Sequence, residues 1–402
     1  MPSRRRLAVV REGRALLYIP DPSRAIVSGR LEPAWLDVFY NPAMEFNRDF
    51  SVAVFKTLLK NIGGRSRIAL DAHTGVGVRG IRYLLEAGFD EVLMNDLNPE
   101  ASGLASLNAR LNRIDPKRYA IYTRDANSLM HHLRLENPTP LAAIDVDPYG
   151  SPAPYIESAL SLAGKGSLLA VTATDLAVLE CSKRAAAVRR YQLASARRLS
   201  QSKEVGLRIL LGFIARRAAS LDKYIVPKVS MYAGHYYRLI LEVGRGARRA
   251  DRMLQESIGM AVYCTNNGVA LLVRQGLEPP CGDGEVVGPL WVSGLGDPMV
   301  AAEVEETVGT MTWLATKKKV SQLSRILRAE YEIGGDSLFY SLTSISSALR
   351  VNTPKKDRVI EFLRSRGYRA APTHFAGDGI RSDAPAGEVV DAVAAVARSS
   401  RA

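Results

Sequence analysis

The sequence predicts an α/β protein in which a doubly wound, mainly parallel sheet is followed by a second, smaller α/β domain. Short aliphatic runs alternate with longer helical stretches, with one run about every 25 residues. A G-x-G-x-x-G loop follows the first of these runs and opens a helix. An aspartate ends each of the first four runs. The chain of 402 residues is long enough for two such domains.

A leading segment, residues 1–65, precedes the alternating pattern. It contains the string VFYNPAMEFNRDFSVAVFKTLLK at residues 38–60, whose second half has the apolar spacing of an amphipathic helix. Asn47 or Asp49 is the candidate N-cap of that helix, because a short polar side chain can accept a hydrogen bond from the first free N–H groups.

Five runs rich in aliphatic residues are the candidate strands of the sheet. Stretches such as Val78–Glu86 and Pro99–Asn112 are the helices expected between them. The five runs are RIALD (67–71), EVLMND (91–96), YAIYTRD (119–125), LAAIDVD (141–147) and GSLLAVTATD (166–175).

Beyond the sheet, the pattern predicts one long basic helical region over 182–222 and a strand-like run over 227–243. The Gly- and Arg-rich stretch 244–251 then changes the composition. We therefore predict one domain over residues 1–245 and a second over 246–402. The helical segments expected in the second domain lie around 300–330 and 354–366.

Composition excludes several classes of protein. Hydrophobic residues make up 47% of the chain, too many for a largely disordered protein, and no apolar run reaches the roughly 20 residues of a membrane span. Lys and Arg total 54 against 41 acidic residues, which gives a net charge of +13. Arg predominates, which suits a polyanionic partner, although a GC-rich genome produces the same bias. The three cysteines are far apart, so we expect a reducing, cytoplasmic compartment and no disulfide framework.

The glycine loop, Gly75-Val-Gly77-Val-Arg-Gly80, marks a candidate cofactor site. Glycine is needed where the backbone turns tightly and approaches a ligand closely. The loop alone fits NAD, FAD and S-adenosylmethionine (SAM) equally well, and such glycines can also form only a tight turn. Carboxylates narrow the choice, because ligands of open parallel sheets bind beyond the carboxyl ends of the strands. The strand-end carboxylates are Asp71, Asp96, Asp125 and Asp147.

The negative charge of these four strand-end carboxylates favours SAM over a dinucleotide as the ligand. Four carboxylates would repel a pyrophosphate, whereas SAM carries a sulfonium, an ammonium group and no phosphate. Asp96 follows Gly75 by 21 residues, a spacing that suits an acceptor for ribose hydroxyls. Taken singly, each aspartate could instead cap a turn or a helix.

The fourth run ends in Asp147-Pro148-Tyr149-Gly150, a sequence suited to an exocyclic amine as methyl acceptor. Methylation of such an amine requires its nitrogen lone pair to be freed from conjugation and directed at the methyl group. Asp147 and a backbone carbonyl near Pro148 can accept the amine hydrogens, and Tyr149 can stack on the base. The same four residues are common in β-turns, but their position behind the glycine loop favours catalysis.

Over most of its length the chain resembles a known family, the tRNA (guanine-26,N2)-dimethyltransferases. The NRD, DPYG and GPLW elements are far more specific to this family than the glycine loop. The stretches that carry the resemblance are FYNPAMEFNRDFS (39–51), DAHTGVGVRGIR (71–82), NDLNPEA (95–101), DVDPYGSPAPYI (145–156), VTATDLAVLE (171–180), KEVGLRILLGFIARRAA (203–219), GHYYRLILEV (234–243), GPLWVSGLGD (288–297) and THFAGDGIRSDAP (373–385). The resemblance implies a Rossmann-like class I methyltransferase sheet. It also implies transfer of one or two methyl groups from SAM to the N2 amine of guanine 26 in tRNA.

The same resemblance implies which residues bind SAM. Arg48 of the NRD element and Arg79 of the glycine loop look like contacts to the polar end of the cofactor. Asp96 looks like the ribose acceptor, and Asp125 with Ala126 resembles the adenine-binding pair. The remaining residues expected at the cofactor are Asp71, Gly75 and Gly77.

For catalysis, the resemblance implies that Asp147 is the reacting carboxylate and that Pro148 fixes its backbone. Phe39 and Tyr149 look like the aromatic walls for a guanine flipped out of the stack. Many relatives have Phe at the position of Tyr149, a change that keeps the stacking face.

One departure from the family concerns zinc. Relatives often carry two C-x-x-C pairs before GPLW, whereas Cys264-Thr-Asn-Asn267 and Cys281-Gly-Asp-Gly284 each retain one cysteine. Two thiolates cannot complete a tetrahedral site, so we expect no zinc. The two cysteines could lie close together, but a cytosolic enzyme makes a disulfide the less favoured outcome.

Two basic stretches, 182–198 and 215–224, are candidates for contacts to tRNA phosphates, although a solvated helix face explains any single arginine about as well. Two rival functions stay open. A nicotinamide-dependent oxidoreductase would use the same glycine loop, but the chain shows no obvious acid/base partner for it. A non-catalytic tRNA-binding protein would keep a relic cofactor pocket, but the glycine loop and DPYG are intact.

Overall fold

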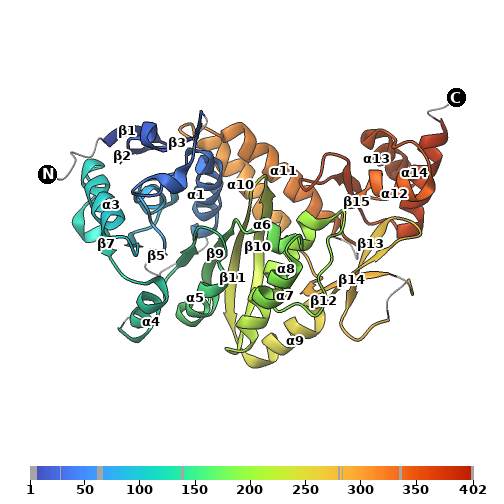
Figure 1. The fold of residues 1–402 in the computed structure, drawn as a ribbon, viewed down its shortest axis with the longest axis horizontal. Coiled ribbons are helices and arrows are strands. Elements are labelled where there is room, and N and C mark those ends of the chain that lie inside the picture. Colours follow the sequence, from blue (N-terminus) through green and yellow to red (C-terminus); the bar gives the residue numbers. More distant parts are fainter. Residues whose placement is uncertain are drawn as a thin grey trace. The chain divides into compact units, whose positions relative to one another are not determined.

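The structure is a computed structural model that describes residues 7–27, 29–60, 67–136, 140–278, 281–282, 284–334 and 337–399. The basic start of the chain and Asp283 of the second cysteine motif lie outside these residues. The chain divides into two compact units (Figure 1). Unit 1 comprises Met1–Pro148, Pro154–Val171 and Ala302–Gln322, and unit 2 comprises Tyr149–Ala153, Thr172–Ala301 and Leu323–Ala402. The domain boundary predicted near residue 245 stays a prediction.

Unit 1 is built on five parallel strands in the order β9-β8-β5-β6-β7, which confirms the predicted fold class. Each of the five predicted runs contains one of these strands. The strands are β5 Ile68–Asp71, β6 Glu91–Asn95, β7 Tyr119–Tyr122, β8 Ala143–Val146 and β9 Ser167–Ala173, of which the last two residues belong to unit 2. Asp71 pairs with Met94 of β6 and with Asp145 of β8, so the carboxyl ends of these strands share one edge.

Helices connect the strands of unit 1. They are α1 Glu45–Leu59, α2 Val78–Arg82, the π-helical turn η4 Tyr83–Ala87, α3 Pro99–Leu111, α4 Ala126–Glu136 and α5 Ile156–Leu162. Helix α1 begins at Glu45, so the expected N-cap role of Asn47 or Asp49 is wrong. Asn41 instead accepts from the Ala43 N–H and opens a 3-10 turn that leads into the helix earlier. Asn47 and Asp49 are therefore buried inside α1.

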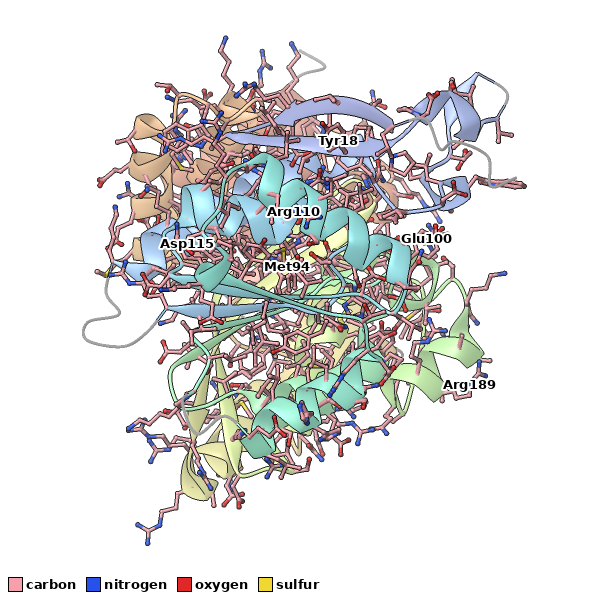
Figure 2. All side chains as sticks on the ribbon, turned by 90° about the vertical axis from the view of Figure 1, so that its left-hand side faces the viewer. Tyr18, Met94, Glu100, Arg110, Asp115 and Arg189 are labelled. Carbon is pink, nitrogen blue, oxygen red and sulfur yellow. A yellow bond between two sulfur atoms is a disulfide. The ribbon has the colours of Figure 1, made fainter. Side chains whose placement is uncertain are left out.

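An N-terminal hairpin lies against α3. Asn108 of α3 accepts from the Tyr18 N–H (2.7 Å) and donates to the Tyr18 carbonyl (2.9 Å). Figure 2 shows Tyr18 beside α3, which is labelled at Glu100 and Arg110. The side chain of Asn108 thus satisfies backbone groups at an edge of the hairpin. The hairpin consists of β1 Leu7–Glu12 and β2 Ala15–Pro20, and the short elements after it are η1 Pro22–Ala25, β3 Ile26–Val27, β4 Arg30–Leu31, η2 Pro33–Trp35 and η3 Pro42–Met44. Two further short turns are η5 Pro116–Arg118, in unit 1, and η6 Ala153–Tyr155, whose first residue belongs to unit 2.

Unit 2 corrects two element predictions. The region 182–222 is not one helix, because Gln192 adopts a left-handed conformation (φ 55°) and ends α7 before α8 begins. The run 227–243 is not one strand, because the chain reverses at Gly234 (φ 62°) and forms an antiparallel hairpin. The elements concerned are α6 Leu176–Leu179, α7 Arg184–Tyr191, α8 Ser202–Ala219, β10 Lys223–Ala233, β11 Tyr236–Arg245 and α9 Ala247–Ser257.

The rest of unit 2 holds two small antiparallel sheets, β13-β12-β14 and β15-β17-β16. Fully buried apolar residues such as Leu342, Val359, Leu363 and Val389 form the core beneath the second sheet. Among the described residues, no helix is long and apolar enough to cross a membrane. The elements are β12 Ile258–Cys264, β13 Val269–Arg274, β14 Glu285–Trp291, α10 Pro298–Thr310, α11 Lys317–Ile333, β15 Tyr340–Ser341, α12 Leu342–Leu349, α13 Lys356–Ser365, β16 Ala370–Pro372, β17 Gly379–Ser382 and α14 Ala386–Ser399, and parts of α10 and α11 belong to unit 1.

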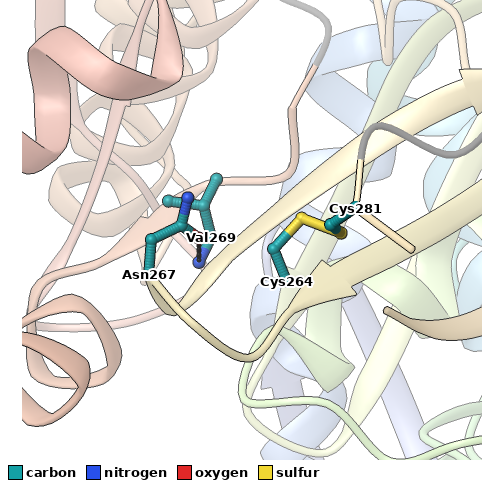
Figure 3. Close-up of a disulfide and its surroundings, with 4 residues drawn as sticks. All are labelled: Cys264, Asn267, Val269 and Cys281. Atoms are coloured by element: carbon teal, nitrogen blue, oxygen red, sulfur yellow. Dashed lines mark hydrogen bonds between the residues drawn. A yellow bond between two sulfur atoms is a disulfide. The ribbon is translucent and has the colours of Figure 1, made fainter. Parts of the chain in front are cut away.

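Cys264 and Cys281 form a disulfide (Figure 3), so the expectation against one is wrong. Cys264 ends β12 and Cys281 precedes β14, and the antiparallel pairing of these strands brings their Cα atoms to 5.9 Å, within disulfide range. In the turn after β12, Asn267 accepts from the Val269 N–H (3.1 Å). Cys181 is a buried free thiol.

Candidate active site

The loop after β5 has the conformation that its glycines predict. Gly75 and Gly77 have φ values of 53° and 84°, which other residues rarely adopt. A Cβ on Gly75 would lie 2.8 Å from the carbonyl oxygen of Phe39, and one on Gly77 would lie 2.9 Å from Cβ of Ala105. Both glycines are therefore required for the close approach of neighbouring segments, and Gly77 also starts α2.

Asp71, the last residue of β5, holds this loop from inside the protein. Its Oδ2 accepts from the Thr74 hydroxyl (2.8 Å) and the Gly80 N–H (3.1 Å). Its Oδ1 has no hydrogen-bond partner among the described residues. Burial raises the pKa of Asp71 to about 7, although the nearby Arg79 charge opposes the shift. The structure thus gives Asp71 a part in shaping the loop.

Asp96 follows β6 and is tied directly to the glycine loop. Its Oδ2 accepts from the Gly75 N–H (2.9 Å) and its Oδ1 from the Asn98 N–H (2.9 Å). The preceding residue, Asn95, donates to the Arg124 carbonyl (3.0 Å) and accepts from the Arg124 N–H (3.2 Å). Sequence reasoning missed Asn95, which joins the loops after β6 and β7.

Asp125 and Ala126 stand after β7, where α4 begins. Asp125 is exposed and accepts from the Ser128 N–H (2.9 Å), as a helix cap does. Ala126 is buried as the first residue of α4. The capping role that any strand-end aspartate can play is thus present here, and adenine binding stays a prediction.

The structure pairs Asp147 with Arg79, two residues that sequence reasoning had assigned separate roles. Arg79 Nη2 donates to Asp147 Oδ2 and also to the side-chain oxygen of Asn47 (2.9 Å). The Arg79 side chain is 5% exposed, whereas that of Asp147 is 19% exposed. The carboxylate is therefore accessible while the guanidinium that fixes it is not.

A second carboxylate lies behind this pair. Asp145 accepts from the Tyr83 hydroxyl and lies 3.6 Å from Nη1 of Arg79. Burial disfavours the charge of Arg79, but Asp147 and Asp145 together raise its pKa above the ordinary value. Sequence reasoning missed Asp145 and Tyr83, although the Asp-Val-Asp pattern at 145–147 offered a signal.

His73, inside the glycine loop, packs edge-on against the ring of Tyr155 with centroids 4.6 Å apart. Neither ring nitrogen has a hydrogen-bond partner among the described residues. Burial lowers the pKa of His73, which favours the neutral imidazole.

Arg48 makes its polar contacts with the N-terminal hairpin. Its Nε and Nη2 each donate to Glu12 (2.6 Å), and Nη2 also donates to the Asn41 carbonyl (3.1 Å). Glu12 also accepts from Arg82 (2.9 Å). Burial opposes ionisation of Glu12, but the two arginines outweigh it and lower the pKa of Glu12 to about 2. Contact of Arg48 with a cofactor stays a prediction.

The two predicted aromatic walls belong to different units and are described separately. Phe39, in unit 1, is 42% exposed, and its carbonyl lies against Gly75. Tyr149, in unit 2, is 80% exposed. The Gly150 N–H donates to Thr174 Oγ1 (2.8 Å), and the Thr174 N–H donates to the Gly150 carbonyl (2.9 Å). This double contact fixes the backbone beside Tyr149.

The basic stretches contain both structural and exposed arginines. Arg190 pairs with Asp175 (2.8 Å), and Arg216 donates to the Tyr191 carbonyl (2.8 Å). Arg189 is exposed on α7, where Figure 2 labels it. Some arginines of these stretches thus have partners within the chain, and contacts to tRNA phosphates stay a prediction.

Comparison with known proteins identifies the family. Residues 25–394 match the family model described as N2,N2-dimethylguanosine tRNA methyltransferase. The chain belongs to this family. It is 53% identical over 398 residues to the tRNA (guanine(26)-N(2))-dimethyltransferase of Aeropyrum pernix, with 98% of each chain covered. It is 35% identical over 394 residues to the protein of the same name from Saccharolobus islandicus, with 96% of this chain and 99% of the relative covered.

A solved structure agrees. Trm1 from Pyrococcus horikoshii in complex with S-adenosyl-L-methionine has a TM-score of 0.84 and 31% identity, and the match covers 96% of this chain and 100% of that one. The predicted family, the α/β methyltransferase fold and the class of enzyme are thus confirmed. The nicotinamide oxidoreductase and the relic binding protein are not supported.

Proposed function

We propose that this protein transfers methyl groups from SAM to the N2 amine of guanine 26 in tRNA. Relatives that match nearly the whole chain bear the name of that activity. The Arg79–Asp147 pair carries the proposal within the chain itself, because it presents an immobilised, accessible carboxylate at the edge of the sheet that holds the glycine loop.

The residues around the glycine loop fit SAM. Gly75 and Gly77 keep the backbone of the loop in left-handed conformations, with Gly77 as the residue before α2. Asp96 accepts from the Gly75 N–H, so a carboxylate lies at the glycine loop and would repel a pyrophosphate bound there. We assign Asp96 to the ribose hydroxyls, Asp125 with Ala126 to the adenine, and Arg48 with Arg79 to the amino-acid end. When bound, SAM supplies an electrophilic methyl group on a sulfonium.

Asp147 positions the nucleophile in this proposal. Arg79 holds Oδ2, so we assign Oδ1 as the acceptor of an N2–H from the guanine amine. Asn47 fixes the guanidinium in turn. The N2 lone pair would form the new N–C bond as the bond between the methyl group and sulfur breaks, its electrons staying on sulfur as a neutral thioether. One N2 proton would pass to Oδ1. Positioning supplies most of the rate, because the methyl group already has a good leaving group.

The flipped guanine needs aromatic side chains on which to stack and a fixed backbone beside them. We assign Phe39 and Tyr149 to stack on the flipped guanine. The Gly150–Thr174 contacts keep the chain beside Tyr149 in one conformation. We further propose that residues 246–402 help to bind tRNA, that the site needs no zinc and that the enzyme works in the cytoplasm.

Nucleoside analysis tests the proposal. Unmodified tRNA transcript is incubated with SAM that carries a deuterated methyl group, then digested and analysed by mass spectrometry. We expect heavy N2-methylguanosine or N2,N2-dimethylguanosine. Heavy label on another atom or base, or no label while SAM still binds, would overturn the proposed reaction.

A further inference from the structure

Three sequence elements without an assigned role meet at one cavity in unit 2. The cavity has a volume of about 290 Å³. Arg208 reaches it from the KEVGLRI element in α8, Ser293 from the GPLW element after β14, and Arg381 from the THFAGDGIRSD element in β17. Arg274 at the end of β13 and Glu330 of α11 complete the polar part of its lining.

Three guanidinium groups line this cavity. The side chains of Arg208 and Arg381 are each 3% exposed, whereas Arg274 is exposed. Glu330 is the carboxylate among the described lining residues. Both of its oxygens are already engaged, one by the Thr373 hydroxyl and the other by a ring nitrogen of His374.

One nitrogen of Arg381 lacks a well-aligned hydrogen-bond acceptor among the described residues. Glu204 accepts from Arg208 Nε (2.8 Å) and from the Phe339 N–H (2.7 Å). Nη2 of Arg381 lies 2.8 Å from Glu204 and 3.9 Å from Glu330, but it is not aligned to donate a hydrogen bond to any described residue. A buried donor without an acceptor is costly, so this nitrogen points to a missing partner.

The charges at the cavity agree with a missing anion. Burial lowers the pKa of Arg208, and the charge of Arg381 adds to this effect while Glu204 opposes it. For Arg381, burial is outweighed by Glu204 and Glu330, which raise its pKa. The three lining arginines therefore face two nearby carboxylates, which leaves one positive charge over at the cavity. An oxyanion in the cavity would compensate this charge.

We propose that the cavity binds a phosphate group of the tRNA backbone, an inference that rests on the proposed function. A planar guanidinium group binds two phosphate oxygens at once, and Arg274 and the unaligned Nη2 of Arg381 are the donors that the lining offers. Arg208 adds positive charge, but its Nη1 already donates to the Ser293 carbonyl (3.0 Å) and its Nε to Glu204. A volume of about 290 Å³ lies near the lower end for small-ligand pockets, so there is room for the phosphate and part of its sugar. Arg274 meets the phosphate first, because it is the exposed member of the set.

Salt-dependent tRNA binding tests the proposal with two matched variants. Arg274→Ala removes a cavity arginine outside the buried ion pairs, and Arg252→Ala removes an exposed arginine of α9 in the same unit. We expect Arg274→Ala to weaken tRNA binding about threefold to tenfold and to reduce the slope of log K against log[NaCl] by about 0.7 to 0.9, the value for one lost phosphate contact. Arg252→Ala should leave both quantities at the wild-type values.

Calorimetry with inorganic phosphate separates the possible sources of the ligand. If phosphate binds the wild type and not Arg274→Ala while tRNA binding is unchanged, the cavity takes a free phosphate and the assignment to RNA is wrong. Equal effects of Arg274→Ala and Arg252→Ala on tRNA binding would also overturn it. Methyl transfer is measured on the same samples. If the salt dependence of tRNA binding differs between the wild type and Arg274→Ala as expected, but the wild type transfers no methyl group, the phosphate site is supported and the proposed reaction is rejected.

Discussion

Replacement of Glu12 by Gln tests the buried ion network that holds the N-terminal hairpin against α1 and α2. Glu12 is 2% exposed and contacts Arg48 (2.6 Å) and Arg82 (2.9 Å). Its pKa falls from 4.5 to about 2 in the folded protein, and each unit corresponds to 1.36 kcal/mol. Glu12→Gln should therefore lower the free energy of unfolding by about 3 kcal/mol at pH 7. Removal of one member of a buried ion pair has a cost of similar size.

The effect of Glu12→Gln should depend on pH with a definite sign. A carboxylate with a lowered pKa stabilises the fold above its unfolded pKa, and this contribution is lost as the pH falls from about 4.5 to about 2. The difference between variant and wild type should therefore shrink to about 1.4 kcal/mol at pH 3. Urea unfolding at both pH values measures it, with the exposed Glu361→Gln as a control that stays within about 0.5 kcal/mol. An ordinary surface substitution changes the free energy of unfolding by up to about 0.5 kcal/mol. A loss of unfolding free energy for Glu12→Gln below about 0.5 kcal/mol at pH 7, or an equal loss at both pH values, would refute the reasoning.

Three further predictions concern the site and the disulfide. Asp147→Ala should abolish methyl transfer but leave SAM affinity within about tenfold, because the carboxylate acts on the acceptor amine; single-turnover transfer and equilibrium dialysis measure the two quantities, and an active variant would contradict the assignment. The free energy of unfolding of Asp71→Asn, minus that of the wild type, should rise by about 2 to 3 kcal/mol between pH 5 and pH 7.5, because a buried carboxyl with a pKa raised from 3.8 to about 7 destabilises the fold as the pH rises. Urea unfolding measures this difference, and a constant value across the range would exclude that cause. Cys264→Ser should lower the free energy of unfolding by about 3 kcal/mol, since the disulfide to Cys281 closes a loop with a separation of 17 residues. A reductant should lower the melting temperature of the wild type to that of the variant, and a wild type insensitive to reductant would show that the disulfide does not contribute.

Much of the fold follows from local patterns in the sequence. Four of the five parallel strands lie inside the predicted runs because they are largely buried and therefore mainly aliphatic, whereas β7 is half-buried and carries two tyrosines. The glycine loop is equally local, since the left-handed conformations of Gly75 and Gly77 exclude most other residues. The start of α1 was misplaced because the cap at Asn41 belongs to a 3-10 turn before the helix, which hydrophobic periodicity does not reveal.

Partners that are far apart in the chain could not be predicted. Residue types and strand ends indicated that Asp147 and Arg79 both belong to the site, but not that Arg79 donates to Asp147. Arg48 was assigned from its motif, and nothing local points to Glu12, which lies 36 residues away in the chain. The same reason explains the disulfide, because the pairing of β12 with β14 brings its cysteines together rather than any motif spacing.

The central claim is that guanine 26 of tRNA is the methyl acceptor. The most direct measurement compares transfer of labelled methyl from SAM to two unmodified transcripts, one with the natural guanine at position 26 and one with adenine there. We predict label on the first transcript, recovered as N2-methylated guanosine, and none on the second. Equal labelling of both transcripts would contradict the claim by placing the reaction at another nucleotide.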